Sequence, residues 1–137
     1  MSNQPEPGVY FASEQPPEGL TLAAPSWNDL DAIDPIELIP GLRFRPVAGE
    51  RLLVNFASYE PGTTVPEHAH EEEQMTFVLE GEFEFTIAGE TRTLTPGMVA
   101  HVPSFVPHAA STGETGCVQV DVFSPPRRTM LEAMRAR

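Results

Sequence analysis

The stretch "HAHEEEQ" places His68 and His70 one residue apart and Gln74 four residues further on. In an extended strand the side chains of residues i and i+2 point to the same face, so two such imidazoles can bind one metal ion from one wall. Gln74 can reach back to the same point across a short turn. A fourth ligand must come from His101 or His108, the two other histidines, and His108 follows the proline-bounded turn "PSFVP".

A second group of reactive side chains lies near the C-terminal end, in "VQVDVFSPPR". Strand alternation puts Asp121 and Phe123 on one face and Val120 and Val122 on the other. We expect the two valines to pack in the core and the other pair to face the opposite side. If that side is the mouth of a barrel, Asp121 and Phe123 lie near the metal. Arg127, just past two prolines, can then close over the mouth and bind a carboxylate bidentately.

Structural roles compete with these functional ones. Asp121 could form a structural ion pair with Arg127 or Arg128, and Phe123 could be an ordinary core residue. The three glutamates of the first stretch are typical of a solvated acidic turn, although one of them could orient a ligand from behind. His101 lies within an expected strand, which favours a packed or rim position over metal binding.

Short apolar runs, punctuated by glycine and proline at intervals of about ten residues, begin at residue 41. The clearest is "GEFEFTIAGETRTL", which alternates and then turns back at Ala88-Gly89, as a hairpin does. Seven or more such runs without a long helix predict an all-β, antiparallel sandwich or barrel. We therefore expect an irregular N-terminal arm over 1–40, with one short helical turn in "WNDLDAI", a barrel over 41–127 and a helix over 128–137.

The composition limits the partners. The 137 residues form one domain, and their net charge of −12 with no basic patch argues against binding to nucleic acid. No apolar run approaches the length of a membrane span, and the first residues lack the regions of a signal peptide, which predicts a soluble, cytoplasmic protein without membrane contact. The single cysteine, Cys117, lies in an apolar run and is expected to be a buried thiol.

Two motifs resemble those of the cupin family. The first runs Gly62-(five residues)-His68-Ala69-His70-(three residues)-Gln74-(six residues)-Gly81, with glutamine where many cupins have glutamate. The second runs Gly97-(five residues)-Pro103-Ser104-Phe105-Val106-Pro107-His108 and departs from the usual pattern at Phe105 and Thr112.

This resemblance implies a single-domain jelly-roll β-barrel in which four residues bind one divalent metal ion: His68, His70, Gln74 and His108. Three neutral imidazoles and a neutral amide leave the full double charge on the ion, which makes it a stronger Lewis acid. Zinc, nickel, manganese and iron all suit such ligands.

The runs "DVFSPPR", "VPEHAH", "EEQ" and "FVLEGEFEFTIAGETRTL" resemble small cupins of the pectin-degradation type, which convert 4,5-unsaturated uronates to their linear keto form. By this resemblance Asp121 would be a proton donor or acceptor, Phe123 would shape the sugar pocket, and Arg127 would bind the substrate carboxylate. Thr76, on the same face as Gln74, would line that pocket.

The leading functional prediction is therefore a metal-dependent isomerase or lyase that acts on a small carboxylated sugar or keto acid by proton transfer. One alternative is a non-haem Fe²⁺ dioxygenase with the same ligands, and another is a metabolite-binding cupin without catalysis. Because a small barrel leaves sheet edges that need covering, we also expect a homodimer, joined through the arm or the terminal helix.

Overall fold

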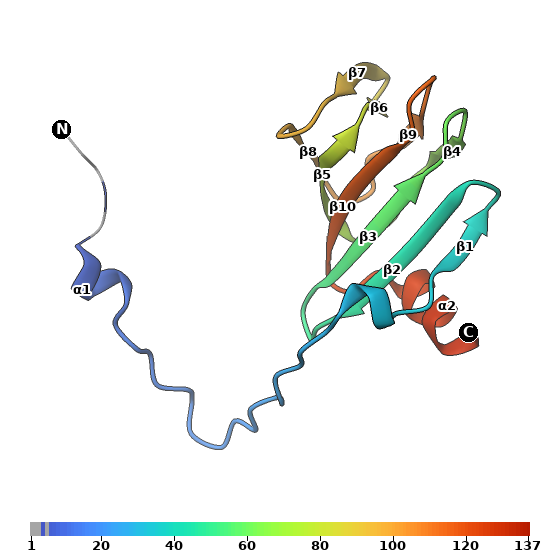
Figure 1. Cartoon of the computed structure of the whole chain (residues 1–137). Helices are drawn as coiled ribbons and strands as arrows, with labels where there is room; N and C mark the ends of the chain where they lie inside the picture. The colour runs from blue at the N-terminus through green and yellow to red at the C-terminus, as the bar shows by residue number, and fades with distance from the viewer. Residues whose placement is uncertain (1–3, 5) are drawn as a thin grey trace.

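Two antiparallel sheets pack face to face and enclose a barrel interior in the computed structural model, which describes residues 4 and 6–137. The all-β jelly-roll prediction is confirmed (Figure 1). The larger sheet has the strand order β1 (Ile36–Ile39), β2 (Leu42–Ala48), β3 (Leu53–Tyr59), β10 (Cys117–Ser124), β5 (Glu73–Gly81), β8 (Val99–Val102). The smaller sheet has the order β4 (Thr64–His68), β9 (His108–Ser111), β6 (Phe83–Ile87), β7 (Glu90–Leu94).

The core lies between the sheets because each strand alternates apolar residues toward the partner sheet. Aromatic rings from both sheets meet there: the ring centroids of Tyr59 and Phe83 are 5.1 Å apart, and those of Phe83 and Phe85 are 5.2 Å apart. Cys117 is buried in the same cluster, as its sequence environment predicts. Burial also raises the pKa of its thiol to about 11.

The hairpin between β6 and β7 turns at the expected residues. Ala88 and Gly89 both have positive φ angles, 50° and 82°. Two successive positive φ values are typical of the tight turn whose twist matches that of paired strands.

Strand β10 lies at the centre of the larger sheet, paired with β3 on one side and β5 on the other. Its inner face carries four residues: Cys117, Gln119, Asp121 and Phe123. The predicted alternation is right, and Val120 is buried as expected, at 3% exposure, while Val122 is half-buried. The two valines nevertheless lie on the face away from the cavity, because the interior of this barrel holds a polar site as well as apolar packing.

The N-terminal segment contains α1 (Pro7–Tyr10), a 3-10 helix (Leu30–Ala32) within the predicted helical turn, and β1. Strand β1 pairs with β2, so residues expected to belong to the arm form an edge of the larger sheet. Before the 3-10 helix the chain runs away from the barrel (Figure 1) and exposes several large apolar side chains: Val9, Tyr10, Phe11, Leu20, Leu22 and Trp27. The homodimer stays a prediction.

Helix α2 (Arg128–Ala136) packs on the barrel through Met130, which contacts Leu53 and Phe123 in a second apolar cluster. Among the described residues, no helix combines the length and apolar character needed to cross a membrane.

Two glycines with similar backbone angles allow a test of the packing between β5 and the loop before β10. A Cβ on Gly81 (φ 76°) would lie 1.9 Å from the carbonyl oxygen of Gly116, whereas a Cβ on Gly89 (φ 82°) would meet no atom within 4 Å. We expect Gly89→Ala to lower the free energy of unfolding by about 1 kcal/mol, the cost of left-handed backbone alone. Gly81→Ala should cost about 3 kcal/mol more, because the backbone must move.

Urea unfolding of the two variants and the parent chain measures both costs. Equal losses would contradict the close approach between Gly81 and Gly116.

Candidate metal centre

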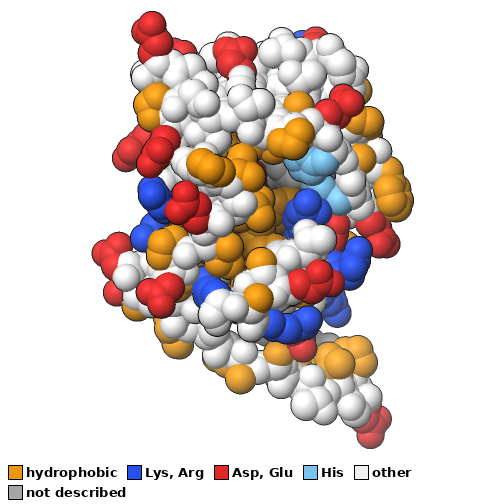
Figure 2. Space-filling model, turned by 90° about the vertical axis from the view of Figure 1, so that its right-hand side faces the viewer, with side chains coloured by type: hydrophobic (Ala, Val, Ile, Leu, Met, Phe, Trp, Pro, Cys, Tyr) orange, Lys and Arg blue, Asp and Glu red, His pale blue; other side chains and the backbone are white. Residues whose placement is uncertain are grey.

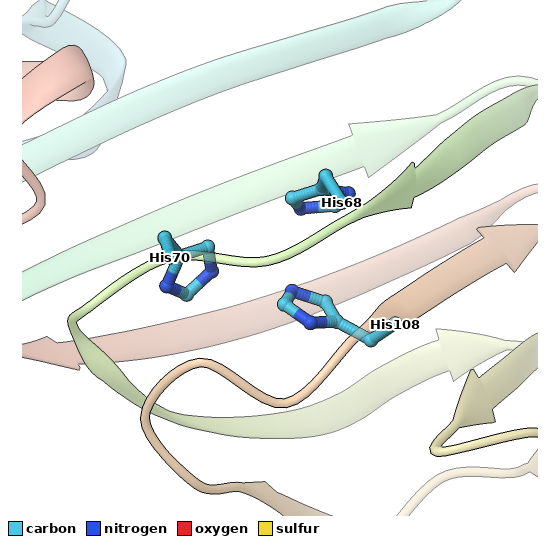
Figure 3. Close-up of side chains that lie close together, drawn as sticks. All are labelled: His68, His70 and His108. Carbon is cyan, nitrogen blue, oxygen red and sulfur yellow. The ribbon is translucent and has the colours of Figure 1, made fainter.

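Three histidines from two strands and a loop converge at one end of the barrel (Figure 3). His68 ends β4, His70 lies in the loop that follows, and His108 begins β9. The β4–β9 register places His68 directly opposite His108. One ring nitrogen of each lies within 4.8 Å of the other two, close enough to bind one ion.

The hydrogen bonds of these rings fix their tautomers. Each Nδ1 lies 2.8 to 2.9 Å from a backbone carbonyl two residues away: Pro66 for His68, Glu72 for His70, and Val106 for His108. Because a carbonyl can only accept, each Nδ1 carries the hydrogen and each neutral ring has an unshared pair on Nε2. Metal-binding histidines in proteins are oriented by such bonds.

Burial also keeps two of the rings neutral. It lowers the pKa of His108 to about 4 and lowers the pKa of His70, where the positive charge of Arg127 adds to the effect. The Nε2 atom of His108 is buried and has no hydrogen-bond partner among the described residues. A buried nitrogen with an unshared pair and no donor is what a cation would satisfy.

Gln74, at the start of β5, presents a fourth oxygen to this point. Its Oε1 lies 3.1 Å from Nε2 of His70. Since His70 carries its hydrogen on Nδ1, this contact brings two acceptor atoms together rather than a donor and an acceptor. A cation between them would turn that repulsion into attraction, so the residues present fit a divalent metal with three imidazoles and one amide oxygen as ligands.

The orientation of the Gln74 amide is set by Asp121. The amide nitrogen donates to Thr76 Oγ1 at 2.8 Å and to Asp121 Oδ1 at 3.3 Å, and Thr76 Oγ1 donates to the same carboxylate oxygen at 2.7 Å. Asp121 is only 4% exposed, and burial raises its pKa to about 6 against the opposing effect of these hydrogen bonds.

Arg127 forms its ion pair with Glu72 rather than with Asp121. Its Nη1 lies 3.7 Å from Glu72 Oε1, and Glu72 Oε2 accepts a 2.8 Å hydrogen bond from the backbone of Arg128. Burial alone would raise the pKa of Glu72, but that hydrogen bond and the charge of Arg127 outweigh it and lower the pKa. Glu72 is therefore no part of a solvated turn: it is buried and ties the start of α2 to the loop of His70.

The predicted site residues fall into three groups. The cavity beside the histidines is lined by Asp121, Phe123 and Arg127 together with the four expected metal ligands: His68, His70, Gln74 and His108. Thr76 is fully buried and lies behind Asp121, where it holds the carboxylate instead of lining the cavity. His101 is exposed and pairs with Glu73 at 2.7 Å, away from the histidine cluster.

Sequence reasoning missed two polar residues of the cavity, Tyr59 and Gln119. Gln119 Nε2 donates to the Tyr59 hydroxyl at 2.9 Å and approaches both carboxylate oxygens of Asp121 at 3.4 Å. Burial, followed by the charge of Asp121, raises the pKa of Tyr59 well above its usual value. The signal was available, since Gln119 shares the Asp121 face of its strand.

The cavity has a volume of about 330 Å³ and lies between the two sheets. Figure 2 looks into it: hydrophobic side chains (orange) cover its base, and histidine (pale blue) and basic (blue) side chains lie along one side. Phe123 forms part of the wall, with its ring centroid 5.7 Å from that of His70 and 5.8 Å from Cζ of Arg127. Phe123 is therefore part of the apolar core and also part of the cavity wall.

Comparisons with known proteins agree with this geometry. The family model described as "Cupin domain" matches residues 55–123. The structure of KdgF from Halomonas sp. is 28% identical, with a TM-score of 0.74, and the match covers 78% of this chain and 99% of that one. An RmlC-like cupin from Shewanella frigidimarina is 27% identical, with a TM-score of 0.73, over 78% of this chain and 96% of that one.

One curated relative is a regulator. The HTH-type transcriptional regulator PuuR of Escherichia coli (strain K12) is 34% identical over 70 residues, which make up 50% of this chain. The match spans only 38% of the length of that relative.

Replacing one ligand at a time tests the metal centre. We expect His108→Ala to weaken binding of Zn²⁺ or Ni²⁺ by at least about 100-fold. Removing a residue that only hydrogen-bonds to a metal ligand costs up to about that factor, and removing a ligand itself should cost no less. His101→Ala is the matched control, because His101 lies outside the cluster, and it should leave affinity unchanged. Calorimetric titration of the metal-stripped proteins measures both. Equal affinities in the two variants would place the metal elsewhere.

Proposed function

The chain belongs to the cupin family, and from this premise we propose that it is a metal-dependent isomerase or lyase. Its substrate would be a small carboxylated sugar, such as a 4,5-unsaturated uronate, or a keto acid. The observation that carries the proposal is the buried carboxylate of Asp121, which borders the same cavity as the three histidines and Arg127.

The four ligands would hold a divalent ion that withdraws electron density from a substrate oxygen. The remaining work falls to residues of the chain. Arg127 is held at the rim by Glu72 and faces the cavity, so its guanidinium can bind a substrate carboxylate. The apolar ring of Phe123, with its centroid 5.8 Å from Cζ of Arg127, would shield that contact from water.

Asp121 moves the proton. Its Oδ1 accepts hydrogen bonds from Thr76 and Gln74, whereas the contact of Oδ2 with Gln119 is longer, at 3.4 Å, so we assign the proton exchange to Oδ2. With its pKa raised to about 6, the carboxylate is ionised but basic near neutrality, which suits a group that takes a proton and gives it back. The proton passes between oxygen and carbon of an enol, and no electron is gained or lost.

A second candidate is metabolite binding without turnover, favoured by the similarity to a transcriptional regulator. The two functions differ in a simple measurement. A binder saturates with ligand and returns it unchanged, whereas an isomerase or lyase alters it.

The test is the decay of ultraviolet absorbance of an unsaturated galacturonate monomer with metal-loaded protein, against a reaction without protein. Exchange of the C3 hydrogens of pyruvate in D₂O, followed by NMR, extends it to keto acids. We expect Asp121→Asn to lower kcat by at least about 100-fold. Its metal content should be unchanged, because the amide oxygen still accepts from Thr76 and Gln74.

His101→Ala serves again as the control and should turn over like the parent chain. Full activity in Asp121→Asn would remove this residue from the mechanism. Substrate-dependent oxygen uptake by the iron-loaded protein would favour a dioxygenase instead.

A further inference from the structure

The cavity is polar at one end and apolar at the other. On the larger sheet, the inward residues of β10 and its neighbours form successive rows: Phe123 with Gln74, Asp121 with Thr76, Gln119 with Val78, and Cys117 with Tyr59. On the smaller sheet, His68 faces His108 in one row, and Val65 faces Ala110 further along. The histidines, Gln74 and Asp121 therefore lie at one end of the cavity, the end marked by Gln74.

The other end is walled by hydrocarbon. Strand β2 contributes Leu42 and Phe44, and the smaller sheet contributes Val65 and Phe85. The edge strand β1 adds three more apolar side chains to this end: Ile36, Leu38 and Ile39. Met130 and Ala133 of helix α2 also line the cavity, and Met130 packs against Phe123 at the Gln74 end.

Few polar atoms remain to receive a sugar. The nitrogens of Gln74 and Gln119 already donate to neighbours. The Tyr59 hydroxyl accepts from Gln119 and keeps its hydrogen to donate, and Thr129 adds one more hydroxyl to the lining. Among described lining residues outside the histidine cluster, Gln119 Oε1 is a buried polar atom without a partner. A sugar acid bears hydroxyls around its ring, and each one buried without a partner costs binding free energy. An apolar body meets no such cost here.

We propose that the preferred ligand is an amphipathic carboxylate: a carboxylate beside an enolisable carbonyl, attached to a hydrocarbon body of about the size of a phenyl ring. The carboxylate lies at Arg127, the enolisable carbon lies beside Asp121, and the body lies between Phe44, Val65 and Phe85. A cavity of about 330 Å³ is at the small end of ligand sites, which fits one such group. This inference rests on the proposed function for its reacting end and chooses the keto acid over the sugar.

The corresponding reaction balances without a co-reactant. The C3–H bond of a 2-keto acid breaks, the proton passes to the Asp121 carboxylate, and the electron pair becomes the C2=C3 double bond of the enolate. The reverse step returns a proton from Asp121 to C3. In D₂O the returned proton is a deuteron, so turnover appears as exchange at C3.

Binding of unreactive analogues tests the ligand class without any turnover. We expect 3-phenylpropanoate to bind the full chain at least about 10-fold more tightly than either galacturonate or acetate, because only the phenyl ring buries apolar surface. Titration followed by protein NMR reaches the millimolar range needed for acetate. Galacturonate binding as tightly as 3-phenylpropanoate would overturn the inference.

A matched pair of variants locates the body of the ligand. Leu38, on β1, lines the cavity and is 57% exposed; Leu79, on β5, is 48% exposed and does not line it. Both tolerate a polar substitution, so neither variant should unfold. Leu38→Gln should weaken 3-phenylpropanoate binding about 3-fold or more and leave acetate unchanged, while Leu79→Gln should change neither. Identical affinities in the two variants would place the phenyl ring outside this cavity.

Exchange at C3 separates this inference from the proposed function. Tight binding of 3-phenylpropanoate, without exchange of phenylpyruvate by the metal-loaded protein, would overturn the chemistry and support the ligand class. Exchange of pyruvate and phenylpyruvate with equal kcat/KM would support the chemistry and overturn the ligand class. A kcat/KM for phenylpyruvate about 10-fold higher supports both.

Discussion

The burial of one carboxylate inside the barrel organises the site. Asp121 cannot remain there without donors, and it obtains them from Thr76, Gln74 and Gln119. Because Gln74 gives its amide nitrogen to Asp121, its oxygen must point the other way, toward Nε2 of His70. The requirement to satisfy a buried charge thus also turns an amide oxygen toward the histidine cluster. Asp121, Thr76 and Gln74 form one hydrogen-bonded unit that borders this cluster.

The position of Asp121 in the sheet makes this unit rigid. It lies on β10, which has a strand on each side, and its register partners are Asn55 on β3 and Thr76 on β5. A side chain on a central strand cannot move far unless the backbone hydrogen bonds to both neighbouring strands break. The three histidines are held differently, each by a carbonyl two residues away, so their orientation is encoded within a few residues of sequence.

This difference explains what could be predicted from the sequence. The His68–His70 pair follows from local spacing, because an i, i+2 pattern is short-range. The hairpin at Ala88-Gly89 follows for the same reason. By contrast, the choice of His108 over His101 rests on the resemblance to cupins. The roles of Thr76 and Glu72 depend on register and on contact with a distant helix, and no local pattern contains these. Which face of β10 enters the cavity does not follow from its sequence, because a valine-rich face normally indicates the barrel interior, and here Gln119 and Asp121 lie on the inner face.

Helix α2 and strand β1 both line the cavity, but they are held in place differently. Met130 is buried against Leu53 and Phe123, and the backbone N–H of Arg128 donates to Glu72. Displacing α2 would therefore expose an apolar cluster and break a partly buried hydrogen bond. Strand β1 also lines the cavity, but it has a neighbouring strand on one side only. Displacing β1 would break a single ladder, whereas displacing β2 or α2 would also break the β2–β3 ladder or expose the Met130 cluster.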